Sequence, residues 1–596
     1  MQLQQTISQR ISEALQSIFQ IAVDADQVAL QPTRKEFAGS FTFVTFPYTK
    51  QAGKGPEQIG QALGEYLKEN AAEIKGFNVV KGFLNLEVEE AEWLRLFREM
   101  MQQPGYGQAE ASGRNVMVEY SSPNTNKPLH LGHLRNNFLG YSVSEILKAN
   151  GHNVLKANLV NDRGIHICKS MLAYEKFGNG ETPQSSGLKG DHLVGKYYVQ
   201  FDKAYKEQIE ELAAQGVDKE EAKKKAPLML EAQDMLKKWE EGDPAVVNLW
   251  KQMNSWVYAG FDETYRNIGV DFDKFYYESG TYMLGKELVE EGLQKEVFFR
   301  KDDGSVWVDL TDEGLDEKLL LRADGTSVYI TQDLGTAQLK YNDFPYDESL
   351  YVVADEQNYH FQVLKAVLKK LGKPYAEGIY HLSYGMVDLP SGKMKSREGT
   401  VVDADELVLE MEDTARQQTE ELGKIEGFTP EQARELYHTL AMGALKYFLL
   451  KVDPKKRMLF NPQESIDFRG NTGPFVQYSH ARISAILRKA AEMGIQVEAA
   501  SFDDFKNLHE TEQEVIAQLV NYPAVIAEAG KLYAPSVIAN YAYDLAKAYN
   551  RFYQEVSIFN ETDEQARRFR IALSAMVARL LRHSMRLLGI NVPDRM

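Results

Sequence analysis

The stretch from Val116 to Gly140, VMVEYSSPNTNKPLHLGHLRNNFLG, constrains the fold of this chain more than any other segment. It opens with apolar residues typical of a buried strand, continues through a turn rich in Ser, Pro and Asn, and ends in a helical pattern. The tetrad HLGH (130–133) stands where that helix begins. A glycine there lets a ligand approach the backbone, and the free N–H groups of a helix N-terminus attract phosphate. The pattern therefore predicts a nucleotide site at a strand-to-helix turn.

Two histidines and a lysine supply the chemistry of that turn. His130 and His133 bracket Gly132, and Lys127 precedes the first histidine by three residues. Imidazole and ammonium groups can donate hydrogen bonds to phosphoryl oxygens as negative charge develops on them. Such a tetrad can also be a simple helix cap, so the nucleotide interpretation depends on the strand, helix and lysine that accompany it.

A second motif, GMVDLPSGKMKSREGT (385–400), lies far downstream. Alone, a glycine- and lysine-rich stretch is typical of a solvated turn. Together with HLGH it resembles the paired signatures of class I aminoacyl-tRNA synthetases, a HIGH-type tetrad and a KMSKS-type loop. Four blocks narrow the resemblance to arginyl-tRNA synthetases, and they stand in the order EYSSPNTNKPLHLGHLR, SVYITQD (327–333), GKMKSREG and NTGPFVQYSHAR (471–482).

The resemblance implies an α/β fold in three parts. These are an N-terminal α+β accessory domain that contacts tRNA (1–110), a Rossmann-like class I catalytic domain (111–400) and a helical linker with an all-α anticodon-binding domain (401–596). We expect a strongly charged helical insertion at about 190–275 inside the catalytic domain. Parallel sheets place ligands at the carboxyl ends of their strands, which is where HLGH stands.

The resemblance also implies a reaction in protein biosynthesis. L-Arginine is activated by ATP to arginyl-adenylate and transferred to the 3′ end of arginine tRNA. In-line attack at phosphorus depends on positioning and charge stabilisation more than on a protein nucleophile. Mg²⁺ should accompany the ATP through phosphate and water. The expected catalytic groups are His130, His133, Lys127 and Lys393, and the expected ATP-binding residues are His130, Gly132, His133, His360, Lys393, Met394, Lys395 and Ser396.

The chain departs from the family pattern at several positions. Ser396 stands where KMSKS has its second lysine, the residue that reaches the phosphates. Arginyl enzymes without that lysine often carry a basic residue just before the tetrad, and Lys127 occupies that place. Gln332 stands where many relatives have arginine, and Arg163 also looks atypical.

Selecting arginine requires planar acceptors for the five guanidinium donors. Tyr329 and Asp333 match the family's amino-acid pocket, and Glu278 is a second candidate carboxylate. Glu119 or Asn124, together with Gln357, would meet the α-amino and carboxylate ends of the substrate.

Three further residues are expected to contact tRNA: Tyr478, Arg482 and Met596. Aromatic and Arg side chains stack on unpaired bases, although a core role fits Tyr478 equally well. The net charge of −18 argues against a sequence-blind polyanion binder. Residues 561–596 nevertheless hold seven Arg against four acids, a local basic face.

Composition sets the remaining expectations. With 43% hydrophobic and 26% charged residues, and without a long apolar run, the chain reads as a cytoplasmic protein that does not enter a membrane. Its single cysteine, Cys168, excludes an internal disulfide and a Cys-based zinc site. A monomer is what the family suggests.

Three other classes of protein share parts of this pattern. Cysteinyl synthetases need thiolate-rich zinc ligands, which one cysteine cannot supply. Small HxGH nucleotidyltransferases lack a helical RNA-binding domain of this size. A catalytically inactive paralogue that only binds tRNA conflicts with the intact HLGH tetrad, but Ser396 leaves it possible.

Overall fold

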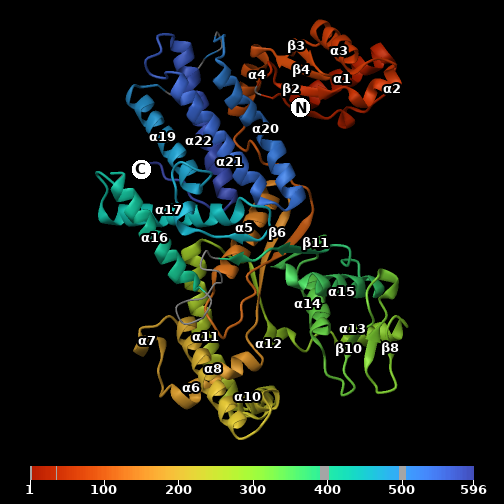
Figure 1. The fold of residues 1–596 in the computed structure, drawn as a ribbon, viewed down its shortest axis with the longest axis vertical. Coiled ribbons are helices and arrows are strands. Elements are labelled where there is room, and N and C mark those ends of the chain that lie inside the picture. Colours follow the sequence, from red (N-terminus) through yellow and green to blue (C-terminus); the bar gives the residue numbers. More distant parts are fainter. Residues whose placement is uncertain (1–2, 35, 389–401, 424, 496–501, 503–504) are drawn as a thin grey trace. The chain divides into compact units, whose positions relative to one another are not determined.

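The computed structural model describes residues 3–34, 36–388, 402–423, 425–495, 502 and 505–596 (Figure 1). The chain forms two compact units, each assembled from separate stretches of sequence. Unit 1 comprises Met1–Gly107, Arg482–Val525 and Asp544–Leu581. Unit 2 comprises Gln108–Ala481, Ile526–Tyr543 and Arg582–Met596.

Unit 1 begins with a four-stranded antiparallel sheet in the order β1-β2-β4-β3. Its helices bury the faces that their apolar spacing predicts: Ile7, Ile11 and Leu15 of the first helix are all buried. The elements are α1 (Leu3–Phe19), β1 (Leu30–Pro32), β2 (Phe41–Val44), α2 (Thr49–Ala52), α3 (Pro56–Asn70), β3 (Ile74–Val80), β4 (Phe83–Val88) and α4 (Glu90–Met101).

Unit 2 is built on a five-stranded sheet in the order β12-β11-β5-β6-β7, and every pair in it is parallel. The strands are β5 (Asn115–Glu119), β6 (Asn153–Val160), β7 (Lys274–Tyr277), β11 (Glu348–Ala354) and β12 (Ile379–Tyr384), and α5 (Leu131–Ala149) connects β5 to β6. Strand order reverses at β5, because β6 lies on one side of it and β11 on the other. Ligands bind outside the carboxyl ends of strands at such a switch point. The predicted Rossmann-like core is confirmed.

Helices fill the chain between β6 and β7. They are α6 (Ile165–Phe177), α7 (Pro183–Ser186), α8 (Gly190–Ala214), α9 (Lys219–Lys225), α10 (Pro227–Glu240) and α11 (Pro244–Ile268). Beyond β7 and the short α12 (Glu278–Thr281) and α13 (Lys286–Gln294), a small antiparallel sheet contains β8 (Phe299–Arg300), β9 (Val306–Val308) and β10 (Lys318–Leu321). A hairpin turns at Gly304 between β8 and β9, and this glycine has φ +87°. Two helices, α14 (Tyr329–Asp343) and α15 (Asn358–Lys370), flank β11 in sequence.

From Ala404 onward the described chain is almost entirely helical, as predicted. The elements are α16 (Ala404–Glu421), α17 (Pro430–Leu450), α18 (Pro462–Ser465), α19 (Gly473–Glu492), α20 (Glu510–Leu532), α21 (Pro535–Glu555) and α22 (Glu564–Leu587). One short strand, β14 (Met458–Leu459), pairs in parallel with β13 (Val387–Asp388). Leu545, Tyr549 and Phe552 are fully buried and form a packing stripe along α21.

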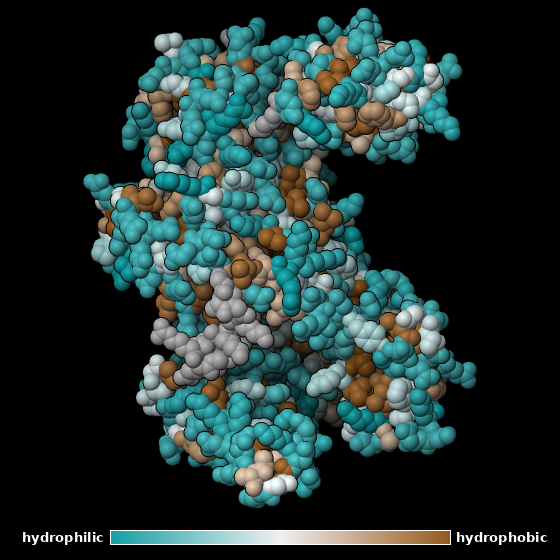
Figure 2. Space-filling model, viewed as in Figure 1, coloured by the Kyte–Doolittle hydropathy of each residue, from teal (hydrophilic) through white to brown (hydrophobic). Residues whose placement is uncertain are grey.

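The surface is that of an ordinary charged protein. The face drawn in Figure 2 is mostly hydrophilic, with apolar residues scattered in small groups. Within the described ranges, no helix is long and apolar enough to cross a membrane.

Candidate active site

The HLGH tetrad caps α5 with its own imidazoles. His130 is the N-cap residue, and its Nδ1 accepts a hydrogen bond from the backbone N–H of Gly132 at 3.1 Å. Nδ1 of His133 accepts from the backbone N–H of His130, also at 3.1 Å. The two bonds form a reciprocal capping box, a role that Ser and Glu usually fill. The rings lie together, with centroids 3.9 Å apart.

This cap fixes the protonation of both rings. Because each Nδ1 accepts a hydrogen bond, the proton of each neutral ring resides on Nε2. Burial and the nearby Lys127 lower the pKa of His130 to about 4. Burial, reinforced by His130 and Lys127, holds the pKa of His133 well below its usual value. Near pH 7 both side chains are therefore neutral, each with one Nε2–H left to donate.

Lys127 completes the cationic side of the turn. It is half-buried, and burial lowers its pKa. An ammonium group, two imidazole N–H donors and a helix N-terminus together suit the polyphosphate of ATP, so these residues fit that ligand.

Arg135, two residues past the tetrad, holds the start of the second motif. Its side chain is only 1% exposed. The guanidinium donates to the carbonyl oxygens of Gly385 at 2.6 Å, Pro454 at 3.0 Å and Lys456 at 2.9 Å. Burial lowers the pKa of Arg135 to about 10, since backbone carbonyls rather than a carboxylate receive it. The first residue of GMVDLPSGKMKSREGT is thus tied directly to α5.

The chain that follows the second motif returns to the tetrad. The backbone N–H of Leu131 donates to the carbonyl of Val402 at 3.2 Å, and that of Ala404 donates to Leu129 at 2.9 Å. Asp403 forms an antiparallel bridge with His130. The expected ATP ligands Lys393, Met394, Lys395 and Ser396 lie outside the described residues.

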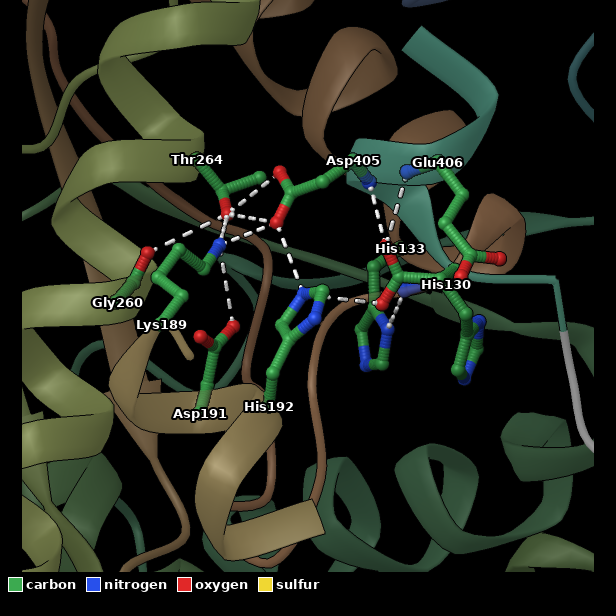
Figure 3. A network of polar contacts seen from close by, with 10 residues as sticks. His130, His133, Lys189, Asp191, His192, Gly260, Thr264, Asp405 and Glu406 are labelled. Carbon is green, nitrogen blue, oxygen red and sulfur yellow. Dashed lines mark hydrogen bonds and ion pairs between the residues drawn. The ribbon is translucent and has the colours of Figure 1, made fainter. Parts of the chain in front are cut away.

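A charged cluster fastens this returning chain to the inserted helices (Figure 3). The carboxylate of Asp405, in the first turn of α16, pairs with Lys189 and accepts from Thr264 Oγ1 at 3.0 Å. His192 Nε2 lies 3.2 Å from the same carboxylate and 3.4 Å from that of Asp403. Lys189 and His192 belong to the start of α8, and Thr264 to α11.

The acidic and basic groups of this cluster stabilise one another's charged forms. The hydrogen bond with Asp405 raises the pKa of His192 despite its burial. Burial would raise the pKa of Asp405, but hydrogen bonds from His192 and Lys189 outweigh it and lower the pKa to about 2. Asp191, His192 and Asp405 each place one possible metal-ligand atom within 4.8 Å of the others. Lys189 already lies among them, 3.3 Å from Asp191, so the cluster contains its own cation.

The residues expected to hold arginine lie at the start of α14 and in the segments that follow β5, β7 and β11. Asp333 is joined to His360, with 2.6 Å between its Oδ2 and the imidazole Nε2. Tyr329, at the first turn of α14, is 79% exposed. Asn124 and Gln357 are also exposed.

Glu119, at the end of β5, has a partner that sequence reasoning missed. Its carboxylate is 5% exposed and pairs with the buried ammonium of Lys340 from α14. The charge that we expected to meet the substrate is therefore already balanced within the protein.

Glu278 lies in a carboxylate-rich neighbourhood. Burial raises its pKa; Arg163 opposes this rise, and Asp162 and Asp333 add to it. The effect of Asp333 means that the two expected arginine ligands, Glu278 and Asp333, lie near one another. Arg163 itself pairs with Glu240 at 2.6 Å and lies over the ring of Tyr282.

Asp162, which follows β6, is another residue that sequence reasoning missed. Its buried carboxylate accepts from the N–H and Oγ of Ser279, at 2.8 and 2.7 Å, and from Tyr258 at 2.9 Å. The signal available for Asp162 was its place directly after a predicted parallel strand. Arg135 and Lys340 carried no comparable signal.

Two expected tRNA contacts, Tyr478 and Arg482, are half-buried on α19. Arg482 donates to Asn550 Oδ1 at 2.5 Å and lies over the ring of Tyr553. The third expected contact, Met596, is half-buried.

Comparison with known proteins gives a consistent assignment along the chain. Residues 96–461 match the catalytic domain of class I (R) tRNA synthetases, residues 5–88 the arginyl tRNA synthetase N-terminal domain, and residues 476–596 the DALR anticodon binding domain. The arginine–tRNA ligase of Amoebophilus asiaticus is 57% identical over 596 residues, covering 100% of both chains. That of Bacteroides thetaiotaomicron is 57% identical over 598 residues, again with 100% of each covered. The solved arginyl-tRNA synthetase of Thermus thermophilus superimposes with a TM-score of 0.77 at 24% identity, covering 100% of both chains.

The parallel sheet with HLGH at its switch point, together with these matches, defines a class I aminoacyl-tRNA synthetase. Within that class, the chain belongs to the arginine–tRNA ligases, and its reaction is the ATP-dependent aminoacylation of tRNA with arginine. The predicted family and activity are confirmed, and the alternative of a chain that only binds tRNA is set aside.

Proposed function

We propose that His130, His133 and Lys127 bind the phosphates of ATP and stabilise the transition state of arginine activation, with Lys393 contributing from the second motif. The observation that carries this proposal is the capping box, which leaves two neutral Nε2–H donors beside a helix N-terminus. Gly132 admits the phosphates to the backbone, and Met394, Lys395 and Ser396 complete the nucleotide contacts.

In the first step, an oxygen of the arginine carboxylate attacks the α-phosphorus of ATP, and the bond to pyrophosphate breaks. Charge grows on the phosphoryl oxygens, where the two imidazoles donate without changing their own protonation. Mg²⁺ bound to the ATP phosphates would neutralise part of their charge. In the second step, the hydroxyl at the 3′ end of tRNA takes the arginyl group, and AMP leaves.

Arginine binds on the side of Asp333 and Glu278. Two carboxylates near one another suit a guanidinium group, because each can accept paired N–H donors. Tyr329 adds its hydroxyl when arginine is present, and His360 orients Asp333 through their 2.6 Å contact. At the opposite end of the substrate, Asn124 and Gln357 are accessible, whereas Glu119 acts together with its partner Lys340.

The remaining roles concern tRNA and the setting of the enzyme. Residues 1–110 contact the corner of the tRNA, 111–400 carry the chemistry, and 401–596 form the linker and anticodon-binding domain, with Tyr478, Arg482 and Met596 as tRNA contacts. The enzyme acts as a cytoplasmic monomer and needs no zinc.

Arginine-dependent exchange of pyrophosphate into ATP, with and without arginine tRNA, tests this function. We expect exchange that depends on arginine and appears only when tRNA is bound. Folded protein that binds the tRNA but shows no exchange in either condition would contradict the assigned chemistry.

A further inference from the structure

Unit 2 contains a cavity of about 1060 Å³ lined by none of the residues assigned above to ATP, arginine or tRNA. Its walls come from four parts of the chain. They are Tyr141 on α5, the end of α11 with residues 266–269, the face of α17 from Gln432 to Lys446, and the end of α22 with residues 589–595.

Positive charge inside this cavity is incompletely balanced. Arg266 and Arg586 are exposed, and neither side chain forms an ion pair or hydrogen bond with any part of the chain that the structure describes. Glu435 is the one lining acid without a basic partner among those same residues. The other lining arginines are engaged, since Arg582 pairs with Asp594 at 2.5 Å and Arg595 donates to the carbonyl of Glu426 at 2.7 Å.

A buried lysine, Lys446, lines the same cavity. Lys446 is 3% exposed and donates to the carbonyl oxygen of Gly589 at 2.5 Å, with no carboxylate partner in the described ranges. Burial lowers its pKa to about 7. A buried ammonium group that lacks a counter-ion is costly, and an anion entering the cavity would offset that cost.

The charges that line the cavity fit a ligand with several phosphate groups. The chain as a whole carries a net charge of −18, so a concave site with excess positive charge stands out against the rest of the molecule. Tyr141 and Arg266 fall in the region that matches the catalytic domain, whereas Arg586 falls in the region that matches the anticodon binding domain. Of the reactants, only tRNA has to contact both regions. ATP and arginine react at the strand ends.

We infer that this cavity binds the phosphodiester backbone of tRNA through Arg266, Arg586 and Lys446. Guanidinium groups bind phosphate oxygens in a bidentate manner. Contacts of this kind position the nucleic acid without reading its sequence. The inference rests on the tRNA substrate of the assigned reaction and adds a place where that substrate is held.

The test is a double variant, R266Q/R586Q, in the full-length protein. We expect the Kd for arginine tRNA to rise about tenfold at moderate salt, and the slope of log K against log salt to become shallower by about 1 to 2. The KM for tRNA should rise, with kcat at saturating tRNA and the KM values for ATP and arginine unchanged. R266K/R586K should recover most of the affinity. In wild type, phosphate-ethylation interference should identify backbone positions that lose their effect in R266Q/R586Q.

The matched control is R300Q/R416Q, which removes two solvent-accessible, ion-paired arginines outside the cavity. Equal effects of R266Q/R586Q and this control on tRNA affinity would overturn the inference. So would a loss of inorganic pyrophosphate binding in R266Q/R586Q with an unchanged Kd for tRNA, because the cavity would then be a site for free anions. Failure of wild type itself to bind arginine tRNA would overturn both this inference and the proposed function.

Discussion

Two histidine environments meet at Asp403. On one side, Asp403 bridges the backbone of His130, whose pKa burial and Lys127 lower to about 4. On the other side, its carboxylate lies 3.4 Å from His192, whose pKa is raised, first of all by Asp405. The same residue type is thus held neutral at the start of α5 and favoured as a cation at the start of α8.

The difference follows from the neighbours of each ring. His130 has a lysine and a second imidazole nearby, and its Nδ1 is occupied by a backbone N–H. A proton added there would meet positive charge and lose a hydrogen bond. His192 faces carboxylates, so its proton is stabilised. The first arrangement suits a group that donates to phosphate, and the second suits a group that holds other residues in position.

The neutral side is tested by His130→Ala. Without the Nε2–H donor and the cap, we expect arginine activation to fall about 10²- to 10⁴-fold, while the Kd for tRNA stays within about twofold. Pyrophosphate exchange and filter binding measure the two quantities. His152→Ala removes a histidine that contacts Ser112 away from the tetrad and serves as the control. Unchanged activation in His130→Ala would refute the site.

A third histidine, His360, extends the comparison, because its partner Asp333 is proposed to bind substrate. In Asp333→Ala the guanidinium loses a charged acceptor, so the KM for arginine should rise about 100-fold, with the KM for ATP preserved. Steady-state exchange kinetics with each substrate varied separate the two values. Asp312→Ala, which removes an exposed carboxylate paired with Lys370, is the control. A normal KM for arginine would show that Asp333 only fixes His360.

The charged side is tested by Asp405→Asn. The amide keeps the shape of the side chain, but Lys189 and His192 lose their shared counter-ion. We expect the start of α16 to lose about 1 to 3 kcal/mol of local stability, and activation to fall about tenfold because Val402 and Asp403 adjoin the tetrad. Hydrogen exchange at the α16 amides and pyrophosphate exchange measure these effects. Asp413→Asn, on an exposed face of the same helix, should change neither; equal losses in both variants would remove the special role of Asp405.

Local patterns were enough to predict the framework of this site. The apolar run of β5, the breakers after it and the helical spacing beyond HLGH are all signals within a short window, and each element forms where expected. The position of HLGH at the sheet's switch point then follows from the rule for parallel sheets.

The protonation states and the anchors could not be predicted in this way. Asp405 and Lys189 are 216 residues apart in sequence, and nothing local indicates that they pair. The ion pair that occupies Glu119 likewise depends on how α14 packs against β5. Residue type identified the donors and acceptors, whereas burial and neighbours decided which of them are charged.

The smallest expected effect is the pH dependence of local stability in His192→Gln. A histidine with a raised folded-state pKa stabilises the fold fully below about pH 6.5, and this contribution is lost as pH rises through the folded pKa. Glutamine keeps a hydrogen bond without the charge. Hydrogen exchange at the Asp405 and Glu406 amides should therefore show the variant weaker than wild type by about 1 kcal/mol near pH 5.5, with the difference fading as pH rises through the folded pKa of His192. His130→Gln is the matched opposite: since its folded pKa is lowered, wild type loses stability as pH falls from about 6.5 towards 4, and the glutamine variant does not. If the stability difference from wild type changed with pH in the same way in both variants, the rings of His192 and His130 would not differ in charge.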